Sequence, residues 1–195
     1  MTATRTAEPA AAFDGVVLAG GRSSRMGTDK AGLPWRGRPL LQYMRGLLEQ
    51  AGAQRVLICG PGSDAQSLPD RQPGLGPLGG LLTLAQTQPD GVYLILPVDM
   101  PRLTSGLLRR LVGALTDAEE ISCAMFAGYV LPLCLRLDEA TRAAIAAVAA
   151  GQAPRMRSLR ALHARLQGAE LAVADDERRC LTNCNTPEQW KEVQP

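Results

Sequence analysis

The stretch "VLAGGRSSRMGTDKAG" (residues 17–32) joins a short apolar run to a loop rich in glycine and positive charge. Glycine lets the backbone turn sharply and come close to a ligand, so that successive N–H groups converge on an anion. Arg25 and Lys30 add positive side chains to the same loop. The stretch therefore predicts a buried strand followed by a cradle for a polyphosphate.

Two common phosphate-binding loops do not fit this stretch. The sequence lacks the G-x-x-x-x-G-K-[ST] pattern of a P-loop, and Gly20, Gly21 and Gly27 do not have the G-x-G-x-x-G spacing of a dinucleotide fold. The remaining alternative is a surface turn with solvated basic residues. A bare Gly-Gly pair would favour that turn, whereas its combination with Arg25 and Lys30 favours the cradle.

Strand-like and helical patterns alternate along the chain, which is typical of an α/β protein with a mainly parallel sheet. The predicted strands are 15–19, 55–59, 92–98, 121–126, 130–136 and 170–174. The predicted helices are 40–51, 78–88, 105–115, 139–150, 156–166 and a short one announced by "TPEQ" at 186–189. Pro39 and Gly52 are expected to bound the first helix, and Thr186 and Gln189 to cap the last.

Length and composition predict one domain. The 195 residues suffice for one well-buried core, so we expect a disordered tail at 1–13 and a single domain at 14–195. The 21 basic and 19 acidic residues nearly balance, which excludes wholesale binding to nucleic acid or to an anionic membrane. The first residues lack the pattern of a secretory signal and no apolar run approaches the ~20 residues of a membrane span, so a cytoplasmic location is expected.

The cysteines are predicted to be buried, reduced thiols, because they are odd in number and form no C-x-x-C pair. They are Cys59, Cys123, Cys134, Cys180 and Cys184. Cys180 and Cys184 are close in sequence, but His163 is the one histidine of the chain, so a zinc site there would be short of ligands.

The opening stretch also resembles the long signature L-A-G-G-x-S-x-R-M-G-x-D-K of the molybdenum cofactor guanylyltransferases. Three further segments are similar to that family in order: "PDRQPGLGPLGGL" (69–81), "LPVDMP" (96–101) and "NCNTPEQW" (183–190). The resemblance covers about residues 15–190. It implies a nucleotidyltransferase with a Rossmann-like three-layer sandwich of the nucleotide-diphospho-sugar transferase type, in which helices cover both faces of a mostly parallel sheet.

Asp99 follows the apolar run 92–98, so its carboxylate is expected at the same sheet edge as the glycine-rich loop. A carboxylate oxygen completed by substrate phosphates and water suits Mg²⁺, whereas the alternative role for Asp99 is to cap a helix. The resemblance implies the metal role.

The resemblance further implies GTP as the nucleotide. The expected nucleotide-binding residues are Leu18, Ala19, Gly20, Gly21, Lys30, Cys59, Asp70, Gly76, Pro77, Leu78 and Asp99. A carboxylate at Asp70 can accept hydrogen bonds from the N1–H and N2–H₂ edge of guanine, which cytosine lacks, whereas its alternative role is that of a turn residue. Cys59 stands where related enzymes often carry an asparagine, and a thiol forms a weaker hydrogen bond than an amide.

A basic cluster of four arginines lies between 155 and 165 without an acidic residue. The alternative to anion binding is a solvated face of a helix whose buried stripe includes Met156 and Leu159. The resemblance implies a phosphorylated pterin as second substrate, held by Arg155, Arg157, Asn183 and Asn185. The two asparagines have an alternative role as turn and cap residues.

The expected reaction is attack by the terminal phosphate of molybdenum-loaded molybdopterin on the α-phosphorus of GTP, forming the guanine dinucleotide cofactor and expelling pyrophosphate. A phosphate monoester has a second pKa of about 6, so no protein base is needed, and His163 is expected only to pack or to lie on a helix. Arg25, Lys30 and the amides of residues 19–21 would stabilise the leaving pyrophosphate, with Mg²⁺ on Asp99.

Two other functions stay open. A sister enzyme that uses CTP usually shows L-A-A-G and T-P-L where this chain has "LAGG" and "GPLGG", which favours GTP here. A non-catalytic nucleotide-binding or carrier protein should lack one of Arg25, Lys30 and Asp99, and the sequence has all three. Implied protein partners are those that insert molybdenum or act as chaperones of molybdoenzymes.

Overall fold

A computed structural model of the chain describes residues 12–20, 30–60, 66–69, 72, 74–153 and 155–194. The strands of the main sheet are β1 (Asp14–Leu18), β4 (Val56–Cys59), β5 (Ser67–Leu68), β6 (Gly91–Pro97), β7 (Cys123–Phe126), β8 (Leu133–Leu137) and β9 (Ala169–Leu171). In the described part of the chain they form a seven-stranded sheet in the order β5-β4-β1-β6-β8-β7-β9. A separate antiparallel ribbon joins β2 (Pro34–Trp35) to β3 (Arg38–Pro39).

Parallel pairing dominates the main sheet, as the sequence predicts. Among the described strands, β8 runs antiparallel to its neighbours β6 and β7, and the other neighbouring pairs are parallel. From β1 the chain passes to β4 and β5 on one side and then returns to β6 on the other side. Ligands of open α/β sheets bind beside such a reversal, at the carboxyl ends of the strands. The topology therefore directs attention to the ends of β1 and β6.

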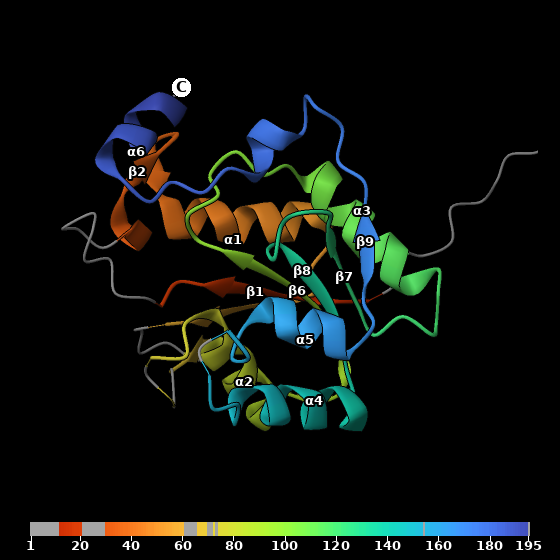
Figure 1. Cartoon of the computed structure of the whole chain (residues 1–195). Coiled ribbons are helices and arrows are strands. Elements are labelled where there is room, and N and C mark those ends of the chain that lie inside the picture. The colour runs from red at the N-terminus through yellow and green to blue at the C-terminus, as the bar shows by residue number, and fades with distance from the viewer. Residues whose placement is uncertain are drawn as a thin grey trace, which may run out of the picture.

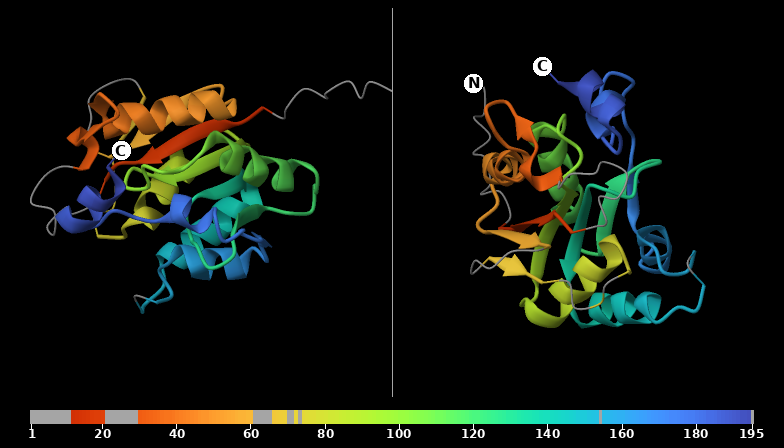
Figure 2. Two further views of the ribbon diagram at one scale, coloured as in Figure 1. Left: turned by 90° about the horizontal axis from the view of Figure 1, so that it is seen from above. Right: turned by 90° about the vertical axis from the view of Figure 1, so that its left-hand side faces the viewer.

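Helices cover both faces of the sheet (Figures 1 and 2). One face carries α1 (Leu40–Ala51), α3 (Ser105–Thr116) and α6 (Pro187–Val193), and the other carries α2 (Pro77–Thr87), α4 (Glu139–Ala149) and α5 (Leu159–Arg165). Each face has its own hydrophobic core, built around Leu48 and Leu108 on the α1 side and around Leu81 and Ile145 on the α2 side. This arrangement confirms the predicted three-layer sandwich.

Local sequence signals explain where the first and last helices begin and end. Leu40, Met44 and Leu48 recur at helical spacing and are buried, and the N–H of Gly52, at φ 107°, donates to the carbonyl oxygens of Leu48 and Glu49. This left-handed conformation suits glycine and ends α1 at the predicted residue. The predicted capping of α6 by Thr186 and Gln189 is also confirmed.

Helix α2 is buried over the eight residues 78–85, because it packs against both the sheet and α4. A Cβ atom on Gly80 would lie 2.8 Å from Cδ2 of Leu18 and 3.3 Å from Cβ of Cys59. Glycine at this position therefore allows α2 to approach the ends of β1 and β4 closely.

The structure differs from the predictions at several places. Met156 lies outside α5 with 53% of its surface exposed, since the Ser158 hydroxyl caps the helix by accepting from the Ala161 N–H. Phe13, placed in the predicted tail, is buried in the core. The elements β2, β3 and β5 have two residues each, too few to produce a periodic pattern.

Four of the five cysteines are buried and not disulfide-bonded, as predicted, and Cys180 is partly exposed. Burial raises the pKa of Cys123 and of Cys134 to about 12. The folded chain therefore keeps protons that the unfolded chain releases above about pH 9. Stability from this source is complete below that pH and is lost as the pH rises toward the folded pKa.

We accordingly expect the free energy of unfolding to fall above about pH 9, by about 1.4 kcal/mol per pH unit for each of these two thiols. Urea denaturation between pH 7 and pH 10.5 measures this slope. Cys134→Ala should make the slope shallower, whatever its effect on stability at pH 7. An unchanged slope in that variant would contradict the assignment.

Candidate functional site

The ends of β1 and β6 bring two predicted site segments to one sheet edge. Leu18 pairs with Pro97, and the N–H of Val98 donates to the carbonyl oxygen of Leu18 at 3.1 Å. Gly20 comes just after β1 and Asp99 just after β6, so both residues lie at the same edge of the sheet. The parallel register alone therefore places the glycine-rich loop beside the carboxylate.

The loop after β4 supports the loop after β1. The N–H groups of Ala19 and Gly20 donate to the carbonyl oxygen of Cys59 at 2.8 and 3.0 Å. These two amides are thus engaged within the protein, which corrects the expectation that they face an anion. A Cβ atom on Gly60 would lie only 2.8 Å from the nitrogen of Gly20, so this contact between the loops requires glycine.

A cavity of about 650 Å³ opens at this edge. Its walls are the end of β1 (residues 18–20), the end of β6 (97–100), the turn after β7 (128–131) and the segment 181–183. Of the predicted site residues, it is lined by Leu18, Ala19, Gly20, Lys30, Pro77, Asp99 and Asn183. Segments far apart in the sequence therefore form one concave surface.

Lys30 and Asp99 form an ion pair at this cavity. Nζ of Lys30 lies 2.8 Å from Oδ2 of Asp99 and 2.7 Å from Oδ1 of Asn185. The side chains of Lys30 and Asp99 are only 14% and 16% exposed, so the pair is largely withdrawn from water. The N–H of Cys184 donates to the carbonyl oxygen of Asp99 at 2.8 Å, which ties the C-terminal segment to the same residue.

The carboxylate of Asp99 fits a divalent metal ion. Its second oxygen, Oδ1, is buried and has no hydrogen-bond partner among the residues that the structure describes. An unpartnered buried carboxylate oxygen is costly, and Mg²⁺ prefers such an oxygen. No cluster of three His, Cys, Asp or Glu side chains that could hold a metal exists in the described ranges, so the ion would take its other ligands from substrate phosphates and water.

Cys184 lies buried beside this ion pair. Burial and, to a smaller extent, the negative charge of Asp99 raise the pKa of its thiol to about 11. The thiol is therefore neutral near pH 7 and adds no charge to the site.

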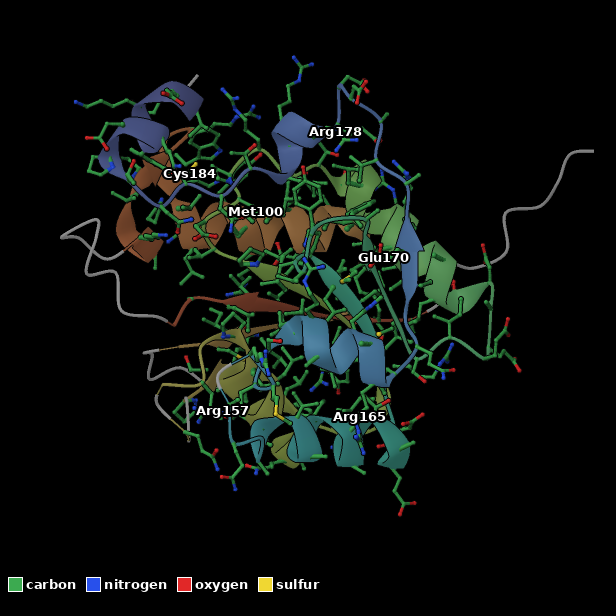
Figure 3. The ribbon with its side chains drawn as sticks, viewed as in Figure 1. Met100, Arg157, Arg165, Glu170, Arg178 and Cys184 are labelled. Carbon is green, nitrogen blue, oxygen red and sulfur yellow. The ribbon has the colours of Figure 1, made fainter. Side chains whose placement is uncertain are left out.

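A second cavity, of about 480 Å³, adjoins the first, because Pro77 and Val130 line both. Arg155, Arg157 and Arg160 line its other side. Figure 3 shows Arg157 on the α2 side of the sheet, whereas Met100 and Cys184 lie on the α1 side. Three of the four arginines of the predicted basic cluster thus line a cavity that adjoins the one at the ion pair, and do not form only a solvated helix face.

The remaining predicted residues differ in their placement. Leu78 lines the second cavity and Gly76 caps α2 beside it. The thiol of Cys59 points toward the carbonyl oxygen of Gly80, at 3.8 Å, and the residue lines neither cavity. Asn185 contacts Lys30. Gly21, Arg25 and Asp70 lie outside the described residues.

The sequence did not indicate the turn after β7. Gly128, Tyr129 and Val130 line the first cavity together with Lys30 and Asp99. The sequence predicts a strand from residue 130, whereas β8 begins at Leu133, and no motif connects residues 128–131 to the glycine-rich loop.

Comparison with known proteins gives one consistent family. The model of the MobA-like NTP transferase domain matches residues 15–171. The chain is 49% identical to a molybdenum cofactor guanylyltransferase from Xanthomonas euvesicatoria over 93% of its own length and 94% of the relative's. It is 37% identical to a probable molybdenum cofactor guanylyltransferase from Mycobacterium tuberculosis, over 88% of each chain.

Solved structures share the fold at low sequence identity. Molybdopterin-guanine dinucleotide biosynthesis protein A from Archaeoglobus fulgidus superimposes with a TM-score of 0.71 and 18% identity, covering 93% of this chain and 96% of that one. A nucleotidyl transferase from Methanothermobacter has a TM-score of 0.70 and 16% identity, with 94% and 96% covered.

The contact between the two loops can be tested with Gly60→Ala. The added methyl group would overlap the backbone of the first loop, so we expect a loss of about 1–3 kcal/mol in the free energy of unfolding. Gly113→Ala, inside α3, is the matched control: its Cβ would meet only Oδ2 of Asp117, at 4.0 Å. That variant should be stabilised by about 0.5–1 kcal/mol. Equal stability of both variants in urea denaturation would refute the proposed close approach.

Proposed function

Because the chain belongs to the family of MobA-like NTP transferase domains and is a nucleotidyltransferase, we propose that it transfers GMP from GTP to the terminal phosphate of molybdenum-loaded molybdopterin. The products are the guanine dinucleotide form of the cofactor and pyrophosphate. The observation that carries this proposal is the Lys30–Asp99 pair at the cavity, with one carboxylate oxygen left without a partner among the described residues.

GTP is proposed to occupy the first cavity. Its triphosphate lies toward Gly20, Lys30 and Asp99, and its base lies toward the start of α2 at Pro77. Asp70, which precedes α2 in the sequence, is proposed to accept from the guanine edge. The relatives named as guanylyltransferases support the choice of GTP over CTP.

The acceptor phosphate is proposed to attack without a protein base, because it is already largely a dianion at neutral pH. His163 supports this view: it is buried, its Nε2 lies 3.2 Å from the carbonyl oxygen of Ala169, and it lines neither cavity. Catalysis then consists of positioning and charge stabilisation.

Lys30 and Asp99 have different roles in the proposed reaction. Lys30, with Arg25, would stabilise the negative charge that builds on the leaving pyrophosphate. Asp99 is the residue that would hold Mg²⁺, and the bound ion would neutralise phosphate charge. The partly buried position of both side chains strengthens these electrostatic effects, because water screens them less.

The molybdopterin substrate is proposed to extend from the first cavity into the second. Asn183 lines the first cavity, and Arg155 and Arg157 line the second. Guanidinium groups form strong, charge-assisted hydrogen bonds with phosphate oxygens. Val130, which lines both cavities, would then lie beside the acceptor. Asn185 lines neither cavity and would take part through its contact with Lys30.

Other parts of the proposal concern the cellular setting. Proteins that insert molybdenum or act as chaperones of molybdoenzymes are proposed to supply the substrate and accept the product, in the cytoplasm. Among the residues that the structure describes, no helix has both the length and the apolar character needed to cross a membrane.

The proposed roles of Lys30 and Asp99 predict the effect of removing either side chain. Lys30→Ala and Asp99→Ala should each lower the rate of pyrophosphate release from GTP by roughly 10²–10³ while the protein stays folded. Lys191→Ala, a change at an exposed residue of α6, is the control and should leave the rate unchanged. A fully active Asp99→Ala enzyme at saturating Mg²⁺ would overturn the assignment of the carboxylate.

The proposed second-substrate site predicts a selective loss of affinity. Arg157→Ala should raise KM for molybdopterin by about 10-fold, because a charge-assisted hydrogen bond is lost, and should leave KM for GTP nearly unchanged. Arg165→Ala is the matched control: Figure 3 shows this second exposed arginine away from Arg157, and it lines neither cavity. Equal effects of the two substitutions would exclude a specific role for the cavity wall.

A further inference from the structure

The side chain of Gln189 holds the backbone just before α6. Its Oε1 accepts from the N–H of Asn185 at 2.7 Å and from the N–H of Thr186 at 3.2 Å. In return, the N–H of Gln189 donates to Oγ1 of Thr186 at 3.3 Å. This capping box therefore fixes not only the start of the helix but also the residue that precedes its cap.

The residue held in this way is the one that contacts Lys30. Oδ1 of Asn185 lies 2.7 Å from Nζ of Lys30, and the neighbouring Cys184 N–H is bonded to the backbone of Asp99. The start of α6 is therefore attached to both charged residues of the site.

Helix α6 is itself firmly docked beside the segment that carries Lys30. Trp190 is buried, and its ring lies 5.5 Å from the ring of Trp35, measured between centroids. Trp35 belongs to β2, which follows Lys30 by only a few residues, and Figure 1 shows α6 beside β2. Lys30 and its partner Asn185 thus lie shortly before β2 and α6, two elements that pack against each other.

From these contacts we propose that Gln189 is a positioning residue, which acts through Asn185 to direct the Lys30 ammonium group into the cavity. The neutral amide oxygen of Asn185 fixes the direction of the ammonium group without cancelling its charge, whereas the carboxylate of Asp99 neutralises it. A lysine side chain has about 2 kcal/mol of rotamer entropy, so a fixed acceptor matters for its placement. The consequence for catalysis rests on the function proposed above.

The placement of Lys30 can be measured without any substrate. The sequence contains only two lysines, Lys30 and Lys191, and Lys191 is exposed on α6. Brief labelling with acetic anhydride, followed by peptide mass spectrometry, gives the ratio of modification at Lys30 to that at Lys191. Gln189→Ala should release Asn185, and Lys30 should then lose its hydrogen bond to the Asn185 side chain. The loss of a hydrogen bond to a charged group should raise the labelling ratio by about 10-fold.

Two further variants separate positioning from helix stability. Gln189→Glu keeps an acceptor for the N–H groups of residues 185 and 186 and should restore the native ratio. Thr186→Ala removes the other half of the capping box, at a cost of about 1 kcal/mol, but keeps the contact between Gln189 and Asn185, so its ratio should stay native. Urea denaturation of each variant checks that it is folded.

Kinetics then test the catalytic consequence. Gln189→Ala should lower kcat for pyrophosphate release by about 10-fold with KM for GTP nearly unchanged, and Gln189→Glu should recover kcat. A native labelling ratio in Gln189→Ala, or equal changes in Gln189→Ala and Thr186→Ala, would overturn the positioning role. Because the labelling uses no nucleotide or pterin, its result stands even if the proposed reaction is wrong.

Discussion

The parallel pairing of β1 with β6 is the constraint on which the site depends. With Leu18 opposite Pro97, the two strands end together, and the glycine-rich loop and Asp99 emerge side by side. A shift of one residue would turn the alternate side chains of either strand to the opposite face and would separate the loop from the carboxylate. The two hydrophobic cores that hold β1 and β6 in this register are therefore also what positions the chemistry.

The C-terminal segment completes this edge of the sheet. It crosses back over the ends of the strands, where Cys184 is bonded to the backbone of Asp99 and Asn185 to the side chain of Lys30. A partly buried ion pair is stable only where further hydrogen bonds satisfy its atoms. The segment supplies such bonds for Lys30, while Oδ1 of Asp99 keeps a position suited to a metal ion. Folding of the last helix and assembly of the site are thereby coupled.

Most of the fold could be predicted from the sequence because its signals are local. Periodic apolar residues, Gly52 and the Thr186–Gln189 capping box define α1 and α6 almost to the residue. The grouping of Lys30 with Asp99 at one edge also follows from strand order. The sequence could not predict three features: the β2–β3 ribbon, the part that the turn after β7 takes in the cavity, and the orientation of the Cys59 thiol. Each depends on packing between segments. The hydrogen bond between Lys30 and Asn185 could not be predicted either, because the two residues are far apart in the sequence.

The most direct test of the central claim is the release of pyrophosphate from GTP and, separately, from CTP, with Mg²⁺ and molybdenum-loaded molybdopterin. A site built around Lys30, Asp99 and a guanine-binding segment predicts release from GTP and little from CTP. Preference for CTP would contradict the guanine assignment but keep the chemistry of the site. Absence of release from either nucleotide, with GTP still bound, would contradict the transferase function and favour a carrier.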